Sequence, residues 1–483
     1  MDIRTAGATE ALALMAKGEL GSEELLDLQL AQVRRHNDSL NLVVALDEDR
    51  ARARCREADR VRARGEAVGP LHGLPITIKD SFETEGLVTT AGAPALATHV
   101  PDRDADAVAL LKRAGAIVYG KTNLPLYAGD FQTFNPLHGL SRNPWDPERT
   151  VGGSSGGAAG ALATGMTLLE LGSDIGGSIR CPAHYTGVAG HKPTWGAISA
   201  RGHVPGPPGT LAPTDLGVMG PLARTVDDLA LAMSILPGSD LAGIPGGRLP
   251  PPAARAASPA GLRVSVWADD PAAPTSQEVT SAVRRLGDQL ADAGARVDES
   301  RPGPSLEDMT ELYLQLLTGT KSIGFPATAL ARFQSFVDAA GPETDRFELA
   351  RARGAVQGHA DWLEADERRH RVIASWDRLF EDVDVVLAPC APVPAFPHDI
   401  ERGFDQRVLD VDGSPMHYGR HIVWAGLATL PLLPATAVPV CRSAAGLPIG
   451  VQVIGARFAD RTTLAVGNLV EEVTGGFVPP PTA

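Results

Sequence analysis

Two glycine-rich segments that contain serines, together with one upstream lysine, carry the residue types needed for a hydrolysis. Residues 152–157 read Gly-Gly-Ser-Ser-Gly-Gly, and Ser178 follows 24 residues after Ser154, within Ser-Asp-Ile-Gly-Gly-Ser-Ile-Arg at 173–180. Lys79 ends a short apolar run. A serine hydroxyl is a poor nucleophile until a neighbouring base takes its proton. These residues therefore predict a serine hydrolase that works without histidine.

The same residues admit three other interpretations, which the surrounding sequence argues against. Residues 152–156 fit the G-x-S-x-G nucleophile elbow, but that elbow needs a strand running into its first glycine. Here residues 143–147 form a loop broken by two prolines, and His398, His417 and His421 are expected to be surface or structural residues. A phosphate-binding loop is not indicated, because no Gly-Lys-Ser/Thr follows. Glycine–serine turns are common, but two of them at predicted strand ends are much less so.

Composition limits the partners that this chain can have. The 483 residues carry a formal net charge of −14, so nucleic acid and anionic membranes, which need basic surfaces, are not expected as partners. No secretory leader and no stretch near the ~20 apolar residues of a membrane helix is seen, so a cytoplasmic enzyme is expected. Neither a metal nor another cofactor is indicated. Four distant cysteines are expected to be buried reduced thiols: Cys55, Cys181, Cys390 and Cys441.

Short strands and helices alternate along the chain, which predicts an α/β fold with a sheet covered by helices on both faces. The serine segments then lie at strand–helix junctions, where glycine permits positive φ and close backbone approach. Expected strands cover 40–46, 74–79, 116–119, 167–171, 262–267, 383–389, 436–440 and 449–454. Expected helices include one that begins at residue 22 and those at 47–64, 106–114, 156–164 and 276–293.

We expect one large domain over residues 1–483. N-terminal helices would occupy 1–70 and the catalytic core 71–236, and the proline-rich linker 237–259 would lead back into the same sheet. The mainly helical segment 300–380 is the best candidate for a variable lid over the pocket. Its apolar residues would supply a pocket wall or else form ordinary helix core: Met309, Tyr313, Leu314, Leu317 and Phe325.

Beyond these patterns, the chain resembles the amidase signature family, whose members are serine hydrolases that cleave amides. The match covers about residues 71–236, and weaker family-like segments continue to 447–452. The motifs that carry it are GLPITIKD at 73–80, GKTNLP at 120–125, NPW at 143–145, the double-serine loop, DIGGSIR at 174–180 and KPT at 192–194. The resemblance implies a large, mixed, mostly parallel twisted sheet with helices on both faces and a helical lid.

The resemblance also assigns site residues one by one. Lys79 matches the family's catalytic lysine, Ser154 its middle serine, held by a cis peptide bond, and Ser178 its nucleophile. The remaining matches are the backbone amides of Ile175, Gly176, Gly177 and Ser178 as oxyanion hole, Ser155, Asp174 and Arg180 as supporting residues, and Ala128 and Gly129 as substrate-binding residues. Cys181 and His184, which follow the nucleophile, are expected to be structural or pocket-wall residues.

Elementary chemistry supports these roles. An ordinary lysine has a pKa near 10.4, so burial beside Ile76 and Ile78 must bring the pKa of Lys79 to about 7, at a cost of ~4 kcal/mol to the charged form. Ser154 can relay a proton from Ser178 to Lys79 and later to the leaving amine, because a hydroxyl both donates and accepts.

The leading hypothesis is a stand-alone amide hydrolase that forms an acyl-enzyme. Residues 126–132, 191–195 and 201–205 resemble the branch of the family that hydrolyses nylon-type cyclic oligomers, anilides and urethanes. Small aryl or aliphatic amides are the expected substrates, and carbamates and aryl esters are further candidates. The alternative is an A-type subunit of a glutamine amidotransferase, which acts with a partner protein; the second half of this chain does not closely resemble such subunits. The sequence leaves a homodimer open.

Overall fold

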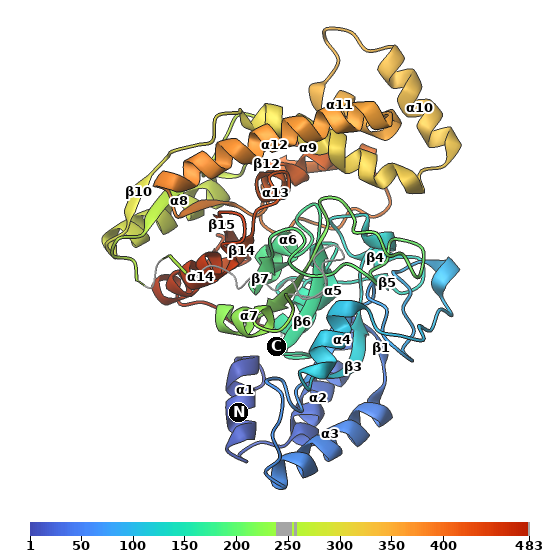
Figure 1. Cartoon of the computed structure of the whole chain (residues 1–483), viewed down its shortest axis with the longest axis vertical. Helices are drawn as coiled ribbons and strands as arrows, with labels where there is room; N and C mark the ends of the chain where they lie inside the picture. Colours follow the sequence, from blue (N-terminus) through green and yellow to red (C-terminus); the bar gives the residue numbers. More distant parts are fainter. Residues whose placement is uncertain (238–253, 256–257, 482–483) are drawn as a thin grey trace.

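The central element of the computed structural model, which describes residues 1–237, 254–255 and 258–481, is an eight-stranded mixed sheet (Figure 1). Its strand order is β10-β9-β11-β15-β14-β7-β8-β6. The strands are β6 (Leu169–Asp174), β7 (Ala189–Lys192), β8 (Val218–Ala223), β9 (Arg263–Val266), β10 (Arg296–Asp298), β11 (Val385–Pro389), β14 (Ala435–Arg442) and β15 (Pro448–Gly455). Strands from both halves of the chain thus share one sheet, and most of the linker expected at 237–259 lies outside the described residues.

A three-stranded sheet of order β1-β3-β2 lies beside β6, because the Thr77 amide of β2 donates to Thr167 Oγ1 at 3.2 Å just before β6 begins. It consists of β1 (Val43–Leu46), β2 (Pro75–Lys79) and β3 (Ile117–Thr122). Two hairpins complete the strands: β4 (Phe134–Asn135) with β5 (Gly139–Leu140), and β12 (Val408–Val411) with β13 (Ser414–His417).

Helices cover both faces of the large sheet, as predicted. A Cβ at Gly190 of β7 would come within 2.7 Å of the Ile179 side chain, next to α6, whereas His191 pairs with Asp460 of α14 at 3.1 Å. Successive strand residues point to opposite faces, so α6 and α14 lie on opposite faces. The helices are α1 (Ala8–Ala16), α2 (Ser22–Leu40), α3 (Glu48–Ala63), α4 (Asp106–Arg113), α5 (Gly156–Ala163), α6 (Arg180–Thr186), α7 (Val226–Met233), α8 (Gln277–Asp292), α9 (Leu306–Lys321), α10 (Ala327–Asp338), α11 (Arg346–Val356), α12 (His359–Asp382), α13 (Val423–Thr429) and α14 (Asp460–Thr474). Short 3-10 turns are η1 (Pro94–Leu96), η2 (Leu126–Ala128), η3 (Ser322–Gly324), η4 (Phe404–Gln406) and η5 (Tyr418–Ile422).

The sheet is mixed, as expected, but the expectation that it is mostly parallel is wrong. Among the described strands of this sheet, β10–β9 and β9–β11 are the parallel pairs, and the other neighbours pair antiparallel. The β14–β15 pair shows the physical reason. Residues 443–447 alone join these two strands, which is too short for the crossover that a parallel pair needs.

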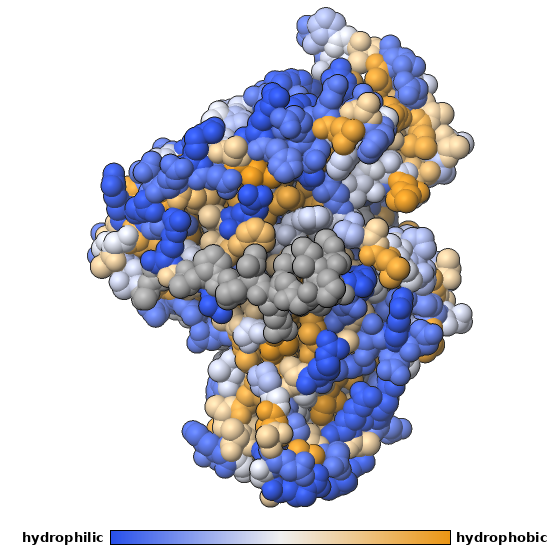
Figure 2. Space-filling model, in the orientation of Figure 1, coloured by the Kyte–Doolittle hydropathy of each residue, from blue (hydrophilic) through white to orange (hydrophobic). Residues whose placement is uncertain are grey.

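The segment expected to form a helical lid consists of α9 to α12, which lie together at the end of the molecule opposite α1 to α3 (Figure 1). The inner faces of α9, α11 and α12 share one buried apolar cluster with α13, which includes Trp376 of α12 and Trp424 of α13. Helix α10 projects from it and has no buried residue. Figure 2 shows apolar surface at this end, where Ile323 is 95 % exposed and Phe336 43 %. None of the helices described here combines the length and apolar character needed to cross a bilayer.

Candidate active site

Lys79 is the last residue of β2 and its side chain is completely buried. The Nζ atom donates to Ser154 Oγ at 2.7 Å, to Ser155 Oγ at 3.0 Å and to Ser173 Oγ at 3.0 Å. Burial lowers the pKa of Lys79 to about 7, although two nearby carboxylates act in the opposite direction. Near neutral pH the free amine is therefore well populated, which a general base requires.

The hydroxyls around this amine favour one direction of proton transfer. A neutral amine has two N–H donors and one lone pair, so one neighbouring hydroxyl must donate to it. Ser155 Oγ already donates to the Ser173 carbonyl, at 3.4 Å. Ser154 has the oxygen nearest to Lys79, so its proton is well placed to lie on the lone pair.

Glycines let the double-serine loop fit between two other segments of the site. A Cβ at Gly157 would lie 2.4 Å from the Asn123 backbone nitrogen, so only glycine allows α5 to begin this close to the end of β3. The Gly153–Ser154 peptide bond is cis, as the resemblance implied. The Ser155 amide donates to the Ser178 carbonyl at 3.1 Å. The double-serine loop is therefore bonded directly to the segment that carries Ser178.

A buried ion pair holds that segment. Asp174 ends β6 and Arg180 begins α6, and Arg180 Nη2 lies 2.8 Å from Asp174 Oδ1. The carboxylate also accepts from the amides of Gly177 at 2.9 Å and Ile179 at 3.0 Å. Burial alone would raise the pKa of Asp174, but the Arg180 charge and these hydrogen bonds lower it to about 2. Arg180 donates further to Gln452 Oε1 at 2.8 Å. Asp174 and Arg180, two of the three expected supporting residues, thus brace the turn around Ser178.

The four backbone amides expected to form an oxyanion hole differ in what they contact. Because the Gly177 amide points at the Asp174 carboxylate, it supports the turn and does not face a substrate in this arrangement. Within the described part of the chain, the amides of Ile175, Gly176 and Ser178 have no protein acceptor. These three remain available to a developing oxyanion.

Ser178 lines a cavity together with Ala128 and Gly129, the two residues expected to bind substrate. The segment expected to form a lid contributes to the lining, including the expected Leu314, Leu317 and Phe325. The other apolar lining residues are Phe131, Ile175, Phe333, Phe347, Phe404 and Ile422. The predicted pocket wall is thus present for these three lid residues.

The two other lid residues named from the sequence lie elsewhere. Met309 is on the buried face of α9 and does not line the cavity. Tyr313 is buried too, and its hydroxyl donates to the Ile175 carbonyl at 2.6 Å. Helix α9 is therefore tied to the turn that carries Ser178.

Two of the charged residues that line the cavity are neutralised within the chain. Asp130 accepts from Arg407 Nη1 at 2.6 Å and from the Tyr418 hydroxyl at 2.6 Å. Arg351 pairs with Glu348 at 2.9 Å and with Asp405 of η4 at 3.1 Å.

Lys321, the last residue of α9, is the third charged residue that lines the cavity. A cation at the end of a helix complements the helix dipole.

Sequence reasoning missed several polar residues of the site. Ser173 contacts Lys79, and its position within the second serine segment was the available signal. Glu170 accepts from Thr77 Oγ1 at 2.7 Å and from a threonine of β3, and burial raises its pKa to about 7. The Asp130–Arg407 pair joins residues 277 positions apart, a contact that no local pattern could indicate.

Cys181 and His184 have structural contacts, as expected. Cys181 Sγ donates to the Cys390 carbonyl at 3.3 Å, and both ring nitrogens of His184 contact backbone groups of Gly450 and Val393. The cysteines are free in the described structure, and all but Cys441, which is partly exposed, are buried. The described residues contain no cluster of three metal-binding side chains.

Comparison with known proteins gives matches along nearly the entire chain. The family model described as Amidase matches residues 24–464. The A-type subunit of glutamyl-tRNA(Gln) amidotransferase from Roseiflexus sp. (strain RS-1) is 34% identical over 489 residues, which cover 96% of each chain. Indoleacetamide hydrolase of Bradyrhizobium diazoefficiens is 34% identical over 480 residues, which cover 97% of this chain and 86% of its own.

Solved structures are also similar to this chain along nearly its whole length. A crystal structure of an amidase has 30% identity and a TM-score of 0.78, and covers 97% of this chain and all of its own. A 6-aminohexanoate cyclic dimer hydrolase complexed with substrate has 25% identity and a TM-score of 0.77, with 98% of each chain covered. Neither the nylon-oligomer branch nor the amidotransferase subunits are singled out, but the shared architecture is clear. The chain belongs to the amidase, or amidase signature, family of hydrolases.

Proposed function

We propose that this protein is an amide-bond hydrolase with Ser178 as nucleophile and a proton relay through Ser154 to Lys79. The observation that carries the proposal is the buried amine of Lys79, with a pKa of about 7, only 2.7 Å from Ser154 Oγ. The double-serine loop is in turn bonded to the Ser178 backbone. Base, relay and nucleophile therefore belong to one connected set of contacts.

In the proposed reaction, Ser178 Oγ attacks the substrate carbonyl carbon as its proton passes to Ser154, whose own proton passes to Lys79. The carbonyl oxygen becomes an oxyanion that accepts from the amides of Ile175, Gly176 and Ser178. Losing one such donor typically costs ~3 kcal/mol of transition-state stabilisation.

The proton on Lys79 then returns through Ser154 to the leaving nitrogen, the C–N bond breaks, and an amine departs from an acyl-Ser178 ester. Nitrogen must be protonated because an amide anion is a very poor leaving group. Water repeats the attack with the same relay, releases the carboxylic acid and restores the free hydroxyl of Ser178.

Aromatic and aliphatic side chains dominate the cavity, and Asp130 and Arg351 are neutralised by partners. Such a lining favours substrates with an apolar aryl or alkyl group. Small aryl and aliphatic amides are the main proposed substrates. Carbamates and aryl esters need the same acyl-transfer chemistry, and we include them.

A second candidate function is an amidotransferase A-type subunit, which needs a partner protein. It is favoured by the similarity to the A-type subunits from two Roseiflexus strains, which covers 96% of this chain. This similarity includes the second half, so the expectation that the second half does not closely resemble such subunits is wrong. In this function the amide would be glutamine, and the ammonia would pass to the partner.

One set of experiments tests both functions. The turnover of the purified chain is measured on a nitroanilide, a nitrophenyl carbamate, a carboxylate-bearing anilide, an aliphatic amide and glutamine. The molecular mass of the protein in solution is determined under the same conditions, which shows that no partner protein is present. A fluorophosphonate probe is expected to label Ser178, and Ser178→Ala to lose all turnover. Full activity of that variant would refute the mechanism. If glutamine were the one substrate cleaved, and a partner protein were required for its cleavage, the amidotransferase function would be favoured.

A further inference from the structure

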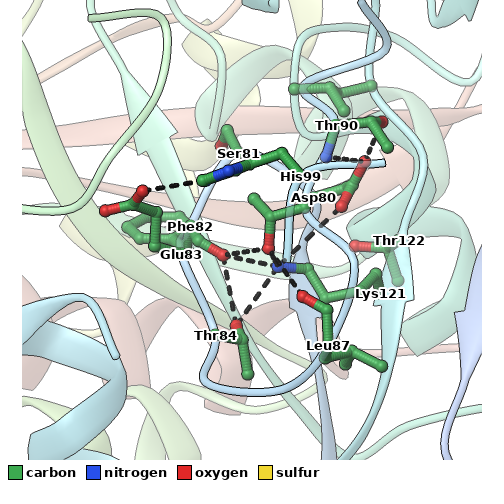
Figure 3. A network of polar contacts seen from close by, with 12 residues as sticks. Asp80, Ser81, Phe82, Glu83, Thr84, Leu87, Thr90, His99, Lys121 and Thr122 are labelled. Atoms are coloured by element: carbon green, nitrogen blue, oxygen red, sulfur yellow. Dashed lines mark hydrogen bonds and ion pairs between the residues drawn. The ribbon is translucent and has the colours of Figure 1, made fainter. Parts of the chain in front are cut away.

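A second buried lysine, Lys121, lies on the strand next to the proposed base and takes no part in the relay. Its Nζ atom is 3.8 Å from Asp80 Oδ1, and both side chains are almost fully buried. Figure 3 shows Lys121 pointing into a group of oxygens, and it donates to the Phe82 carbonyl at 2.5 Å, Thr84 Oγ1 at 3.2 Å and Thr89 Oγ1 at 3.0 Å. These acceptors belong to the loop that follows β2.

Lys121 and the proposed base point to opposite faces of the small sheet. In the parallel β2–β3 pair, Lys79 stands opposite Thr122, and Thr122 Oγ1 donates to Glu170 on the side where Lys79 meets the serines. Side chains alternate along a strand, so Lys121 lies on the other face. Asp80, the next residue after Lys79, lies there with it.

Asp80 holds the end of β2 through both its backbone and its side chain. Its amide donates to the Thr122 carbonyl at 3.0 Å, and its carbonyl accepts from the Ala91 amide at 2.9 Å. Its Oδ2 atom accepts from the Thr90 amide at 3.1 Å and from the Thr90 hydroxyl (Figure 3). The position of Lys79 is therefore fixed from the residue that follows it.

The same contacts reach the substrate cavity. The Ala91 carbonyl accepts from the Tyr127 amide at 2.9 Å, and Tyr127 lies within η2, the turn that brings Ala128 and Gly129 into the cavity lining. The contacts of Asp80 and Ala91 thus connect the strand of the proposed base to residues that line the cavity.

A buried ion pair rarely adds net stability, because desolvating two charges offsets their attraction. This pair is also imperfect, since Asp80 Oδ1 has no hydrogen-bond partner among the described residues. A mainly stabilising purpose is therefore a poor explanation for it. We infer that the Lys121–Asp80 pair is a positioning device, which holds Lys79 among the serine hydroxyls and keeps water from its amine. This inference rests on the proposed role of Lys79 as base.

The test compares Lys121→Met and Asp80→Asn by their pH–rate profiles, where the acid limb of kcat/KM reports the pKa of Lys79. Removing a nearby cation would raise that pKa by charge alone, and removing a nearby anion would lower it. Loss of position admits water to the amine and raises the pKa in both variants. The other ionisable groups that act on or face Lys79 are Asp174, Glu170 and His203, and both variants keep them.

We expect both variants to lose at least tenfold in kcat/KM and to shift the acid limb upward, by about one pH unit. The inference would be overturned if the acid limbs of the two variants shifted in opposite directions. It would also be overturned if both limbs stayed in place and the loss of activity came only from a smaller fraction of active enzyme. Thr90→Val is a milder variant that removes one bond to Asp80, and it should shift the limb in the same direction. If the first two variants fail to fold, an unchanged limb in Thr90→Val overturns the inference by itself.

Glu83→Gln is the matched control, because Glu83 pairs with His99 at 3.0 Å in the same loop without contacting Asp80 or Lys121 (Figure 3). It should change kcat/KM less than threefold and leave the limb in place. Failure of the proposed function itself would look different. The unaltered enzyme would then show no limb near pH 7, or the fluorophosphonate would not label Ser178.

Discussion

The protonation of Lys79 should be visible in both the activity and the stability of the protein. The gap between its ordinary pKa of 10.5 and its value of about 7 in the folded chain corresponds to roughly 5 kcal/mol of penalty on the charged form. Below pH 7 the lysine is charged in the folded and the unfolded chain, so the penalty is fully present. Above pH 10.5 it is neutral in both, and the penalty is gone.

Between these limits the unfolded chain binds more protons, so this group makes stability rise with pH. Lys79→Met removes the charge and with it the penalty, whereas the loss of hydrogen bonds to serines is independent of pH. The free energy of unfolding of the variant minus that of the unaltered protein should therefore fall by roughly 2–3 kcal/mol from pH 6 to pH 9. Urea unfolding at several pH values measures this difference.

The activity follows the same ionisation. In the unaltered protein kcat/KM should rise about tenfold per pH unit below pH 7 and level off above it. Lys79→Met should reduce kcat/KM by at least a hundredfold at pH 8, because the relay then ends at a thioether. Lys17→Met is the control for activity, since Lys17 is exposed and lies outside the site, and it should leave kcat/KM unchanged. A pH-independent stability difference for Lys79→Met would refute the reasoning.

Two further predictions concern the turn around Ser178. Gly177→Ala should lower kcat at least tenfold, because Gly177 has φ +95° and a Cβ there would lie 2.5 Å from Cys181 Sγ; adding Cys181→Ala should restore part of the loss, and full activity of the single variant in a steady-state assay would contradict this. Arg180→Met should lower the free energy of unfolding by ~3–5 kcal/mol, because it leaves Asp174 buried without its cation. Urea unfolding at pH 7 checks this, and a loss below about 1 kcal/mol would show that Asp174 is stabilised mainly by the backbone amides.

Local chemistry made much of this structure predictable. The apolar run before Lys79 indicated the strand that became β2, and the charged segment that became α3 was equally clear. The expected strand–helix junction is present for the second serine segment, between β6 and α6. It is wrong for the double-serine loop, because residues 141–151 before that loop form no strand, although Gly157 against Asn123 shows the expected close approach. The motif match then supplied the residues whose side chains meet.

What could not be predicted depends on contacts between distant segments. The order of the strands follows from which connections are short, as between β14 and β15, and from packing that no local pattern encodes. The Gly177 amide looks equivalent to its neighbours in the sequence, and only the position of the Asp174 carboxylate shows that it is engaged. Similarly, nothing in the residues around Lys121 indicates that its partner is Asp80, the residue just after the adjacent strand β2.

Three buried lysines, Lys79, Lys121 and Lys192, show that burial alone does not make a general base. Burial lowers their pKa values to about 7, about 8 and about 7, so each could be neutral near physiological pH. Lys192 donates to the Pro193 carbonyl, which can accept a hydrogen bond but cannot deliver a proton. Lys121 faces a carbonyl, threonine hydroxyls and a carboxylate on the side of the sheet away from the serines. Lys79 alone among these three faces serine hydroxyls, which both donate and accept, in a loop bonded to Ser178, and this connectivity is what makes its lowered pKa useful for catalysis.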